Sequence, residues 1–226
     1  TTGSGASCNA LTVNSGATLT INSGGSLITN GIITKNGTVN IHKTISDDQW
    51  SFVSIPVNTA TANSFFNDYL QYWDEPNAQW LEITDETTPL TPVKGYSLWP
   101  PSGKSSITFS GTPNNGEQSI GITYTEVAGA ENDGANLVGN PYPSYIDWDL
   151  VSGYGAKYTW NGTGYDQYVY DDQSGYGDGD QYAYPMEGFF IVVNADGTFS
   201  LDNSMRCHPP TPGKTHKNKK IENALI

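Results

Sequence analysis

The sequence predicts an all-β fold: a short N-terminal β-solenoid-like segment followed by a pseudo-repeated antiparallel β-sandwich. Three observations lead to this prediction. The 226 residues include 14 Tyr, 6 Trp and 25 Gly but only 10 Lys and Arg together, so β-forming and turn residues outweigh helix formers. Short β-forming runs recur near the N-terminus with Gly turns between them. A longer pattern then occurs twice after residue 50.

The N-terminal segment is predicted over residues 1–43. Written in eights, residues 11–34 read LTVNSGAT, LTINSGGS and LITNGIIT, so each short run is followed by a turn. Gly and Asn suit such turns because they tolerate positive φ. Short strands at a fixed period stack as a β-solenoid or as a tight meander. Fewer than four rungs would not fold well alone, so we expect this segment to cap something larger.

The duplicated sandwich is predicted over residues 44–208, with halves at about 50–113 and 136–205. Each half contains a strand that ends in Pro, two aromatic strands, a Pro-x-x-Gly-aromatic strand and a closing strand. Gly95-Tyr96 and Gly188-Phe189 belong to the fourth of these parts, and we expect them at equivalent positions of two related sheets that face each other.

Two other segments of the chain depart from this pattern. Residues 171–180 are an insertion that only the second half carries. The Pro- and Lys-rich residues 209–226 are interpreted as a linker to a following domain.

The charge distribution excludes some partners. The net charge is −13, and residues 1–205 hold 5 Lys against 22 Asp and Glu, a balance of −17. Nucleic acid and anionic membrane surfaces both require basic patches, so neither is an expected partner. No apolar run approaches the ~18 residues that a membrane span needs, and we expect no membrane insertion. Cations, neutral glycans and basic surfaces remain compatible with this charge.

The two cysteines, Cys8 and Cys207, lie near opposite ends of the sequence. No CxxC pattern of a metal or redox site is present. They could form one disulfide that ties the N-terminal segment to the last strand, or they could be two unrelated thiols. The sequence leaves both alternatives open.

The string Gly-Asn-Pro-Tyr-Pro-Ser at residues 139–144, followed by Ile-Asp-Trp at 146–148, resembles a β-rich domain of long secreted Bacteroidetes proteins. That domain typically lies upstream of a type IX secretion sorting domain. Residues 109–116, 185–190 and 205–208 support the resemblance. It implies export and display at the cell surface or outside the cell. It says little about activity, because both adhesin-like proteins and polysaccharide-degrading enzymes contain such domains.

Catalytic motifs are not found. The sequence has no HExxH, no GxSxG and no Gly-rich phosphate loop. Asp147 and Asp149 flank Trp148 and would be the nearest approach to a glycosidase carboxylate pair. We favour the interpretation that they satisfy turn backbone beside a core Trp, and we do not expect an enzyme.

Residues 165–184 are the most unusual segment, because tyrosines alternate there with aspartates. One hypothesis is a Ca²⁺ site in a flexible loop of hard oxygen ligands, Asp171, Asp172, Asp178 and Asp180. A second is a sugar-stacking surface that Trp73 and Trp80 of the first half could extend, with Tyr165, Tyr168, Tyr170 and Tyr176 as its tyrosines. The third is a long hairpin with core tyrosines and a solvated acidic tip.

Together these patterns predict a non-catalytic extracellular accessory or adhesin-like module. Its most plausible ligand is a polysaccharide or a cell-surface glycan, with Ca²⁺ as the candidate cofactor. It would work beside further domains of a longer protein. Two alternatives come from other classes: a structural spacer or stalk of a large surface protein, and a glycan-acting enzyme.

Overall fold

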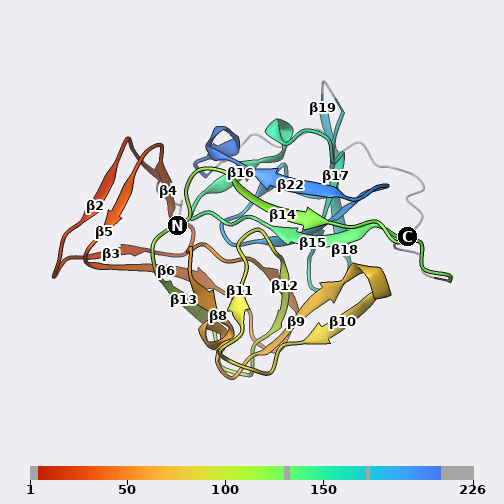
Figure 1. Ribbon diagram of the computed structural model, residues 1–226, viewed down its shortest axis with the longest axis horizontal. Helices are drawn as coiled ribbons and strands as arrows, with labels where there is room; N and C mark the ends of the chain where they lie inside the picture. The colour runs from red at the N-terminus through yellow and green to blue at the C-terminus, as the bar shows by residue number, and fades with distance from the viewer. Residues whose placement is uncertain (1–4, 130–132, 172–173, 210–226) are drawn as a thin grey trace.

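The computed structural model describes residues 5–129, 133–171 and 174–209, and the fold is all-β as predicted (Figure 1). Of the predicted linker, only Pro209 lies within the described residues. Helical structure in the described residues is limited to four short 3-10 turns, and none of them is long or apolar enough to cross a membrane. These turns are η1 (Ala62–Phe65), η2 (Glu75–Asn77), η3 (Trp148–Leu150) and η4 (Asn203–Met205).

The N-terminal segment forms two stacked coils of three strands each. Each strand of the first coil pairs in parallel with its counterpart in the second, so that Gly5 lies opposite Ser26 and Thr18 opposite Thr38. One coil therefore takes about 21 residues. Each eight-residue repeat forms one strand of a coil with its turn, and not a complete coil. Two coils are too few to make a solenoid. The first coil consists of β1 (Gly5–Cys8), β2 (Leu11–Val13) and β3 (Thr18–Ile21), and the second of β4 (Ser26–Thr29), β5 (Ile33–Lys35) and β6 (Thr38–Thr44).

The first half contains a four-stranded antiparallel sheet in the order β10-β9-β12-β7. Beside it, β13 pairs with β6 of the coil, and two short strands pair with each other as β11-β8. The bounds are β7 (Ser51–Val53), β8 (Ala60–Thr61), β9 (Tyr69–Asp74), β10 (Gln79–Glu82), β11 (Pro89–Leu90), β12 (Tyr96–Trp99) and β13 (Ser106–Ser110).

The second half contains a five-stranded sheet in the order β15-β21-β17-β18-β19. Two smaller sheets, β14-β22 and β20-β16-β23, accompany it. The bounds are β14 (Gln118–Ile122), β15 (Ala135–Gly139), β16 (Tyr145–Asp147), β17 (Ala156–Trp160), β18 (Tyr165–Asp171), β19 (Ser174–Gly177), β20 (Tyr182–Ala183), β21 (Gly188–Val192), β22 (Gly197–Leu201) and β23 (Arg206–Cys207).

The two halves repeat one topology, as the pseudo-repeat predicts. The order β10-β9-β12-β7 corresponds strand by strand to β18-β17-β21-β15, and β19 is the addition from the inserted residues. The registers also correspond, since Tyr96 lies opposite Val53 and Phe189 opposite Val138. The pairs β6–β13 and β14–β22 correspond as well, so each half begins before the position that the sequence indicates.

Three apolar clusters hold the layers together. One fills each half, between its main sheet and the β6–β13 or β14–β22 pair. The third lies between the two main sheets, which face each other as expected. We call it the junction cluster; its buried members are Phe52, Ala135, Leu137 and Phe190. The coil lies at one side of the two halves (Figure 1).

The two halves are joined by a pair of equivalent strained turns. Val93 and Met186 are both non-glycine residues at positive φ, 68° and 59°, a conformation that branched or long side chains rarely adopt. The Val93 carbonyl accepts from Gly139 N at 2.7 Å, and the Met186 carbonyl accepts from Ser54 N at 3.0 Å. Each half therefore supplies a turn that hydrogen-bonds to the other half.

The Gly-Asn-Pro-Tyr-Pro-Ser string at residues 139–144 forms a buried corner. Tyr142 is fully buried, and its hydroxyl donates to the carbonyls of Gly116 at 2.6 Å and Leu201 at 2.7 Å. The Arg206 guanidinium lies 4.6 Å from the centre of this ring and donates to Leu27 O at 2.7 Å. Because Leu27 belongs to the coil, the corner fastens the coil to the second half.

The cysteines are two free thiols. Cys8 lies in β1 and Cys207 in β23, and both are half-buried. Burial raises the pKa of Cys207 to about 12, so its thiol stays protonated at neutral pH.

Candidate functional site

An aromatic surface lies on the main sheet of the first half. Successive residues of a strand point to opposite faces. Leu70 and Leu98 point into the core of the first half, so Tyr69 and Trp99 point away from it. We call this outward surface the aromatic face; its rings are Trp50, Tyr69, Trp73, Trp80 and Trp99.

The rings of the aromatic face form two groups at opposite ends of β9. Trp73 and Trp80 lie opposite each other, with ring centroids 5.3 Å apart. Trp50 contacts Trp99 at 5.4 Å and Tyr69 at 6.2 Å. The four positions from Tyr69 to Trp73 separate the groups by about 13 Å along an extended strand. Polar side chains occupy the paired positions between them, namely Gln71, Glu82 and Ser97.

Solvent reaches both groups. Tyr69 is 49% exposed, and the four tryptophans are half-buried. The rings meet edge-on, with interplanar angles of 66° and 67° in the two tryptophan pairs. Each ring is therefore held in place by a neighbour while part of its surface remains free for contact.

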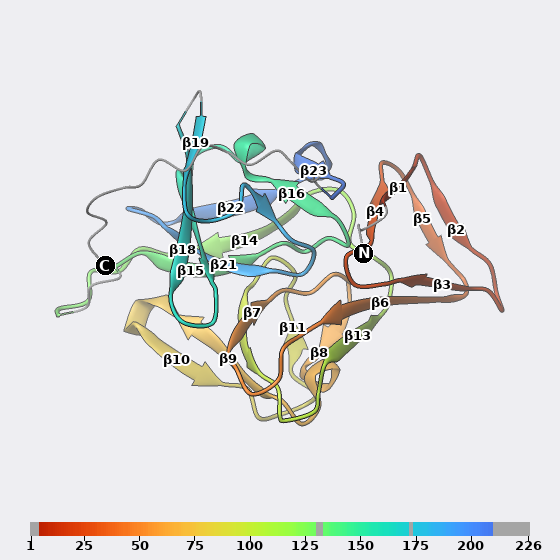
Figure 2. The same cartoon turned by 180° about the vertical axis from the view of Figure 1, so that it is seen from behind.

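The second half contributes two more rings beside Trp73 and Trp80. The β17–β18 hairpin reaches down beside the first sheet (Figure 2), and it carries Trp160 and Tyr165 with ring centroids 5.2 Å apart. Phe52 lies between the two halves, 6.4 Å from Trp160 and 6.2 Å from Tyr165. Trp160 is the repeat equivalent of Trp73, a signal in the sequence that could have identified it as a site residue.

The predicted tyrosines separate onto different faces of β18. Tyr165 is 39% exposed and joins the rings just described. Tyr168 is buried in the core of the second half, where its hydroxyl donates to Asp149 Oδ1 at 2.7 Å. Tyr170 is half-buried against the same core, and the side chain of Tyr176 lies outside the described residues. The structure thus brings Trp73, Trp80 and Tyr165 together and leaves Tyr168 and Tyr170 apart from them.

The acidic insertion continues the β18 hairpin, and its strand β19 projects from the body (Figure 1). Asp178 accepts from Gln167 N at 2.8 Å. Asp180 accepts from Tyr182 N at 3.0 Å and from the Tyr184 hydroxyl at 2.7 Å. The side chain of Asp171 and the whole of Asp172 lie outside the described residues. Among the residues that are described, no three His, Cys, Asp or Glu gather as metal ligands, and the calcium site stays a prediction.

Asp147 and Asp149 hold polar groups around the core Trp148, in agreement with the favoured interpretation. Asp147 Oδ1 accepts from the backbone N of Asp149 at 3.1 Å. Gln181 Nε2 donates to both carboxylates, at 2.8 and 2.9 Å.

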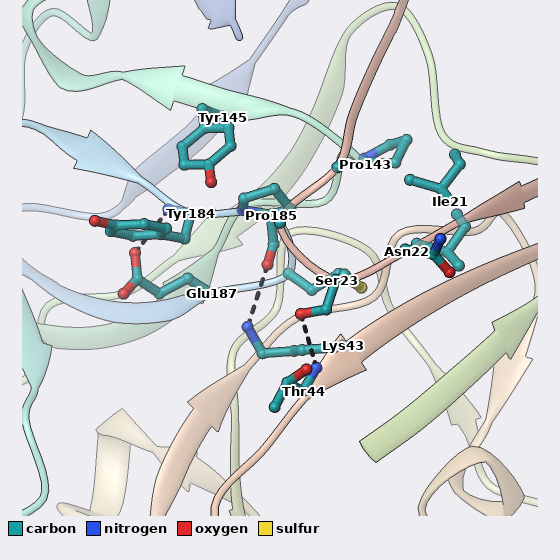
Figure 3. A pocket seen from close by; sticks show the side chains of 14 residues that line it. Ile21, Asn22, Ser23, Lys43, Thr44, Pro143, Tyr145, Tyr184, Pro185 and Glu187 are labelled. Atoms are coloured by element: carbon teal, nitrogen blue, oxygen red, sulfur yellow. Dashed lines mark hydrogen bonds between the residues drawn. The ribbon is translucent and has the colours of Figure 1, made fainter. Parts of the chain in front are cut away.

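A pocket of about 350 Å³ lies between the coil and the second half (Figure 3). Residues 21–25, Ile41, Lys43 and Thr44 line it from the coil, and residues 184–187 line it from the second half together with Pro143 and Tyr145. Lys43 Nζ donates to Pro185 O at 3.2 Å, and Glu187 Oε2 accepts from Tyr184 N at 2.9 Å. Sequence reasoning missed this pocket.

Both charged groups of the pocket have perturbed pKa values. Burial lowers the pKa of Lys43, and the nearby Glu187 carboxylate opposes this effect. Burial raises the pKa of Glu187, and the ammonium groups of Lys157 and Lys43 oppose it. Perturbed titratable groups that line a pocket are typical of functional sites, although structural charge networks also produce them.

Residues 6–153 match the sequence profile of a family described as a domain of unknown function, DUF8693. The match spans the coil, the first half and the start of the second half. No curated protein and no solved structure matches the chain.

Proposed function

The chain belongs to the DUF8693 family of domains of unknown function, and from that premise we propose that it is a non-catalytic extracellular module that binds polysaccharide on its aromatic face. Export and display at the cell surface are part of this proposal. They rest on the resemblance to secreted Bacteroidetes domains.

One observation carries the proposal: partly exposed rings stand at both ends of one sheet face, with polar side chains between them, and at one end Trp73 and Trp80 also pack against the junction cluster. The apolar faces of sugar rings pack on aromatic side chains, and sugar hydroxyls require hydrogen-bonding groups nearby. Gln71 and the exposed Glu82 supply such groups between Tyr69 and Trp73. The separation of about 13 Å between the aromatic groups suits an extended chain better than a single sugar.

The charge of the molecule supports an uncharged polymer as the ligand. Residues 1–205 carry a balance of −17, and like charges in the ligand would be repelled. The aromatic face itself adds Glu82 and no basic residue. We therefore expect neutral polysaccharides to bind better than uronate-rich or sulfated ones.

Affinity gel electrophoresis in native gels that contain a neutral or an acidic polysaccharide tests the proposal. We expect a neutral polymer to retard the protein, and we expect Tyr69→Ala or Trp80→Ala to weaken binding about 5- to 10-fold, since an aromatic contact contributes ~1 kcal/mol. The matched control is Tyr124→Ala, because Tyr124 is an exposed aromatic residue outside the aromatic face. Equal retardation of all the variants, or none of the intact protein in any gel, would refute the proposal.

A structural spacer is the second candidate, and the coil favours it. Within the residues that the structure describes, β1, β2 and β3 each pair with a strand on one side only and are edge strands of the first coil. Unpaired edges are able to accept another strand, as a further coil of a longer surface protein would provide. A protein that binds no polysaccharide but unfolds at a higher temperature when further coils precede it would support this alternative.

A further inference from the structure

The pocket between the coil and the second half shares no residue with the aromatic face. Its floor is apolar, because Ile21, Ile41 and Met186 are all buried there. Its rim is polar and includes Asn22, Ser23 and Thr44 from the coil. A small ligand in this pocket would thus contact both apolar and hydrogen-bonding groups.

Lys43 and Glu187 stand in the pocket as opposite charges that do not touch. They attract each other, yet they form no ion pair within 4.0 Å in the part of the chain that the structure describes. Among the described residues, the Lys43 ammonium donates one hydrogen bond, to the Pro185 carbonyl, and the Glu187 carboxylate accepts one, from the backbone N of Tyr184. An ammonium group has three donors and a carboxylate accepts several hydrogen bonds, so both have capacity to bind a ligand. Figure 3 shows the two side chains on the same side of the Pro185 turn.

Tyr184 offers the pocket a flat ring that is 41% exposed. Its hydroxyl donates to Asp180 Oδ2 at 2.7 Å, and its backbone N donates to Glu187 Oε2 at 2.9 Å. Tyr145 packs beside it with ring centroids 5.2 Å apart. These contacts fix the ring before any ligand arrives, which reduces the entropy lost on binding.

We propose that this pocket binds one uncharged sugar unit, with its apolar face on Tyr184 and its hydroxyls between Lys43 and Glu187. A hydroxyl group can accept from an ammonium and donate to a carboxylate at the same time, so adjacent hydroxyls satisfy both charges. The pair carries no net charge, and the charges of Lys157 and Asp180 near Glu187 also cancel, so little net charge remains to hold an anionic ligand. The acidic body of the protein further disfavours uronates and phosphosugars.

Calorimetric titration with neutral methyl glycosides and with methyl uronates tests this assignment. We expect a neutral glycoside to bind with an affinity that changes little between low and high salt, and we expect the uronates to bind more weakly. Tyr184→Leu, which keeps an apolar side chain but removes the flat ring, should weaken binding at least 10-fold. Asn22→Ala, on the rim, should weaken it less.

Lys43→Met and Glu187→Gln remove one charge each, and both should abolish measurable binding of the neutral glycosides. The Glu187 carboxylate also balances the charge of the buried Lys157. The binding of Glu187→Gln is therefore interpreted only if thermal unfolding shows that this variant is still folded. The matched controls are Lys35→Met on β5 and Glu86→Gln in an exposed loop, which should bind like the intact protein.

Three outcomes would overturn the assignment: tighter binding of a uronate, unchanged affinity in Tyr184→Leu and Lys43→Met, or no binding of any glycoside. None of these outcomes depends on the aromatic face. To separate the two sites, Tyr69→Ala is titrated in parallel and should bind the glycosides normally. A failure of the aromatic face is thereby distinguished from a failure of the pocket.

Discussion

Single buried polar residues hold the separate parts of this molecule in place. Glu75, in the η2 turn of the first half, has a carboxylate that is buried and accepts four hydrogen bonds. The donors are the Thr123 hydroxyl, the Thr125 hydroxyl and backbone N, and Gly134 N. All of them belong to the connection between β14 and β15 of the second half. Glu75 therefore connects the two halves at a position that the repeat pattern does not reveal.

We expect Glu75→Gln to lower the free energy of unfolding by about 2 kcal/mol, because an amide NH₂ then faces donors that a carboxylate satisfied. The change is measured by urea denaturation. Glu86→Gln, which alters an exposed carboxylate, is the control and should change the free energy of unfolding very little. Equal midpoints for the two variants would show that the Glu75 contacts contribute nothing to stability.

The positions of single residues along a strand or beside a turn explain why some site residues could be predicted and others could not. Trp73 and Trp80 flank a turn, so a hairpin places them opposite each other, and the sequence is sufficient to group them. Tyr165 and Tyr168 lie on one strand, but alternation sends them to opposite faces. The β14–β22 pair covers one face of the main sheet of the second half. Only the tertiary structure shows that Tyr168, and not Tyr165, lies on that covered face of β18.

Among the elements, the repeat of the two sheets could be predicted because each copy of the pattern lies within one continuous stretch of sequence. The Pro-x-x-Gly-aromatic pattern recurs in the same order, and the strand order follows it. The coil was harder to predict, because the eight-residue period marks sides of a coil and the pairing occurs about 21 residues apart. The pocket could not be predicted at all, since Lys43 and its partner Pro185 are 142 positions apart.

The glycines of the repeated pattern lie where the two halves approach each other closely. A Cβ atom on Gly95 would lie 2.6 Å from both Val138 O and Leu137 Cγ, and one on Gly188 would lie 2.9 Å from Phe52 Cβ. Such distances are too short for ordinary contacts. The sheets can meet along this line only because neither position carries a side chain.

We expect Gly95→Ala to destabilise the protein by about 2 kcal/mol or more, because the backbone of β15 must move to admit the methyl group. Gly121→Ala is the matched control: it also lies in a strand, but a Cβ there would meet no heavy atom within 4 Å. It should leave stability unchanged or raise it slightly, since Ala loses less entropy than Gly on folding. Thermal melting of both variants measures the difference, and equal melting temperatures would contradict the close approach of the sheets.

At the scale of the whole molecule, both candidate sites lie where separately built parts meet. The aromatic face ends at the junction cluster, where rings of the first half meet Trp160 and Tyr165 of the second. The pocket lies between the coil and the second half. Ligand sites occur preferentially at such boundaries, because the parts that meet there leave concave or uncovered surfaces. The duplication thus positions the aromatic face, whereas the pocket forms where the coil meets the second half.

Tryptophan accessibility during a polysaccharide titration tests the central claim most directly. Trp50, Trp73, Trp80 and Trp99 lie on the aromatic face, whereas Trp148 is fully buried and serves as an internal reference. We expect a neutral polysaccharide that retards the protein in gels to protect tryptophan fluorescence from iodide quenching. This protection should be lost in the double variant Tyr69→Ala, Trp80→Ala and kept in Tyr124→Ala. Unchanged quenching at a saturating polysaccharide concentration would contradict binding on the aromatic face.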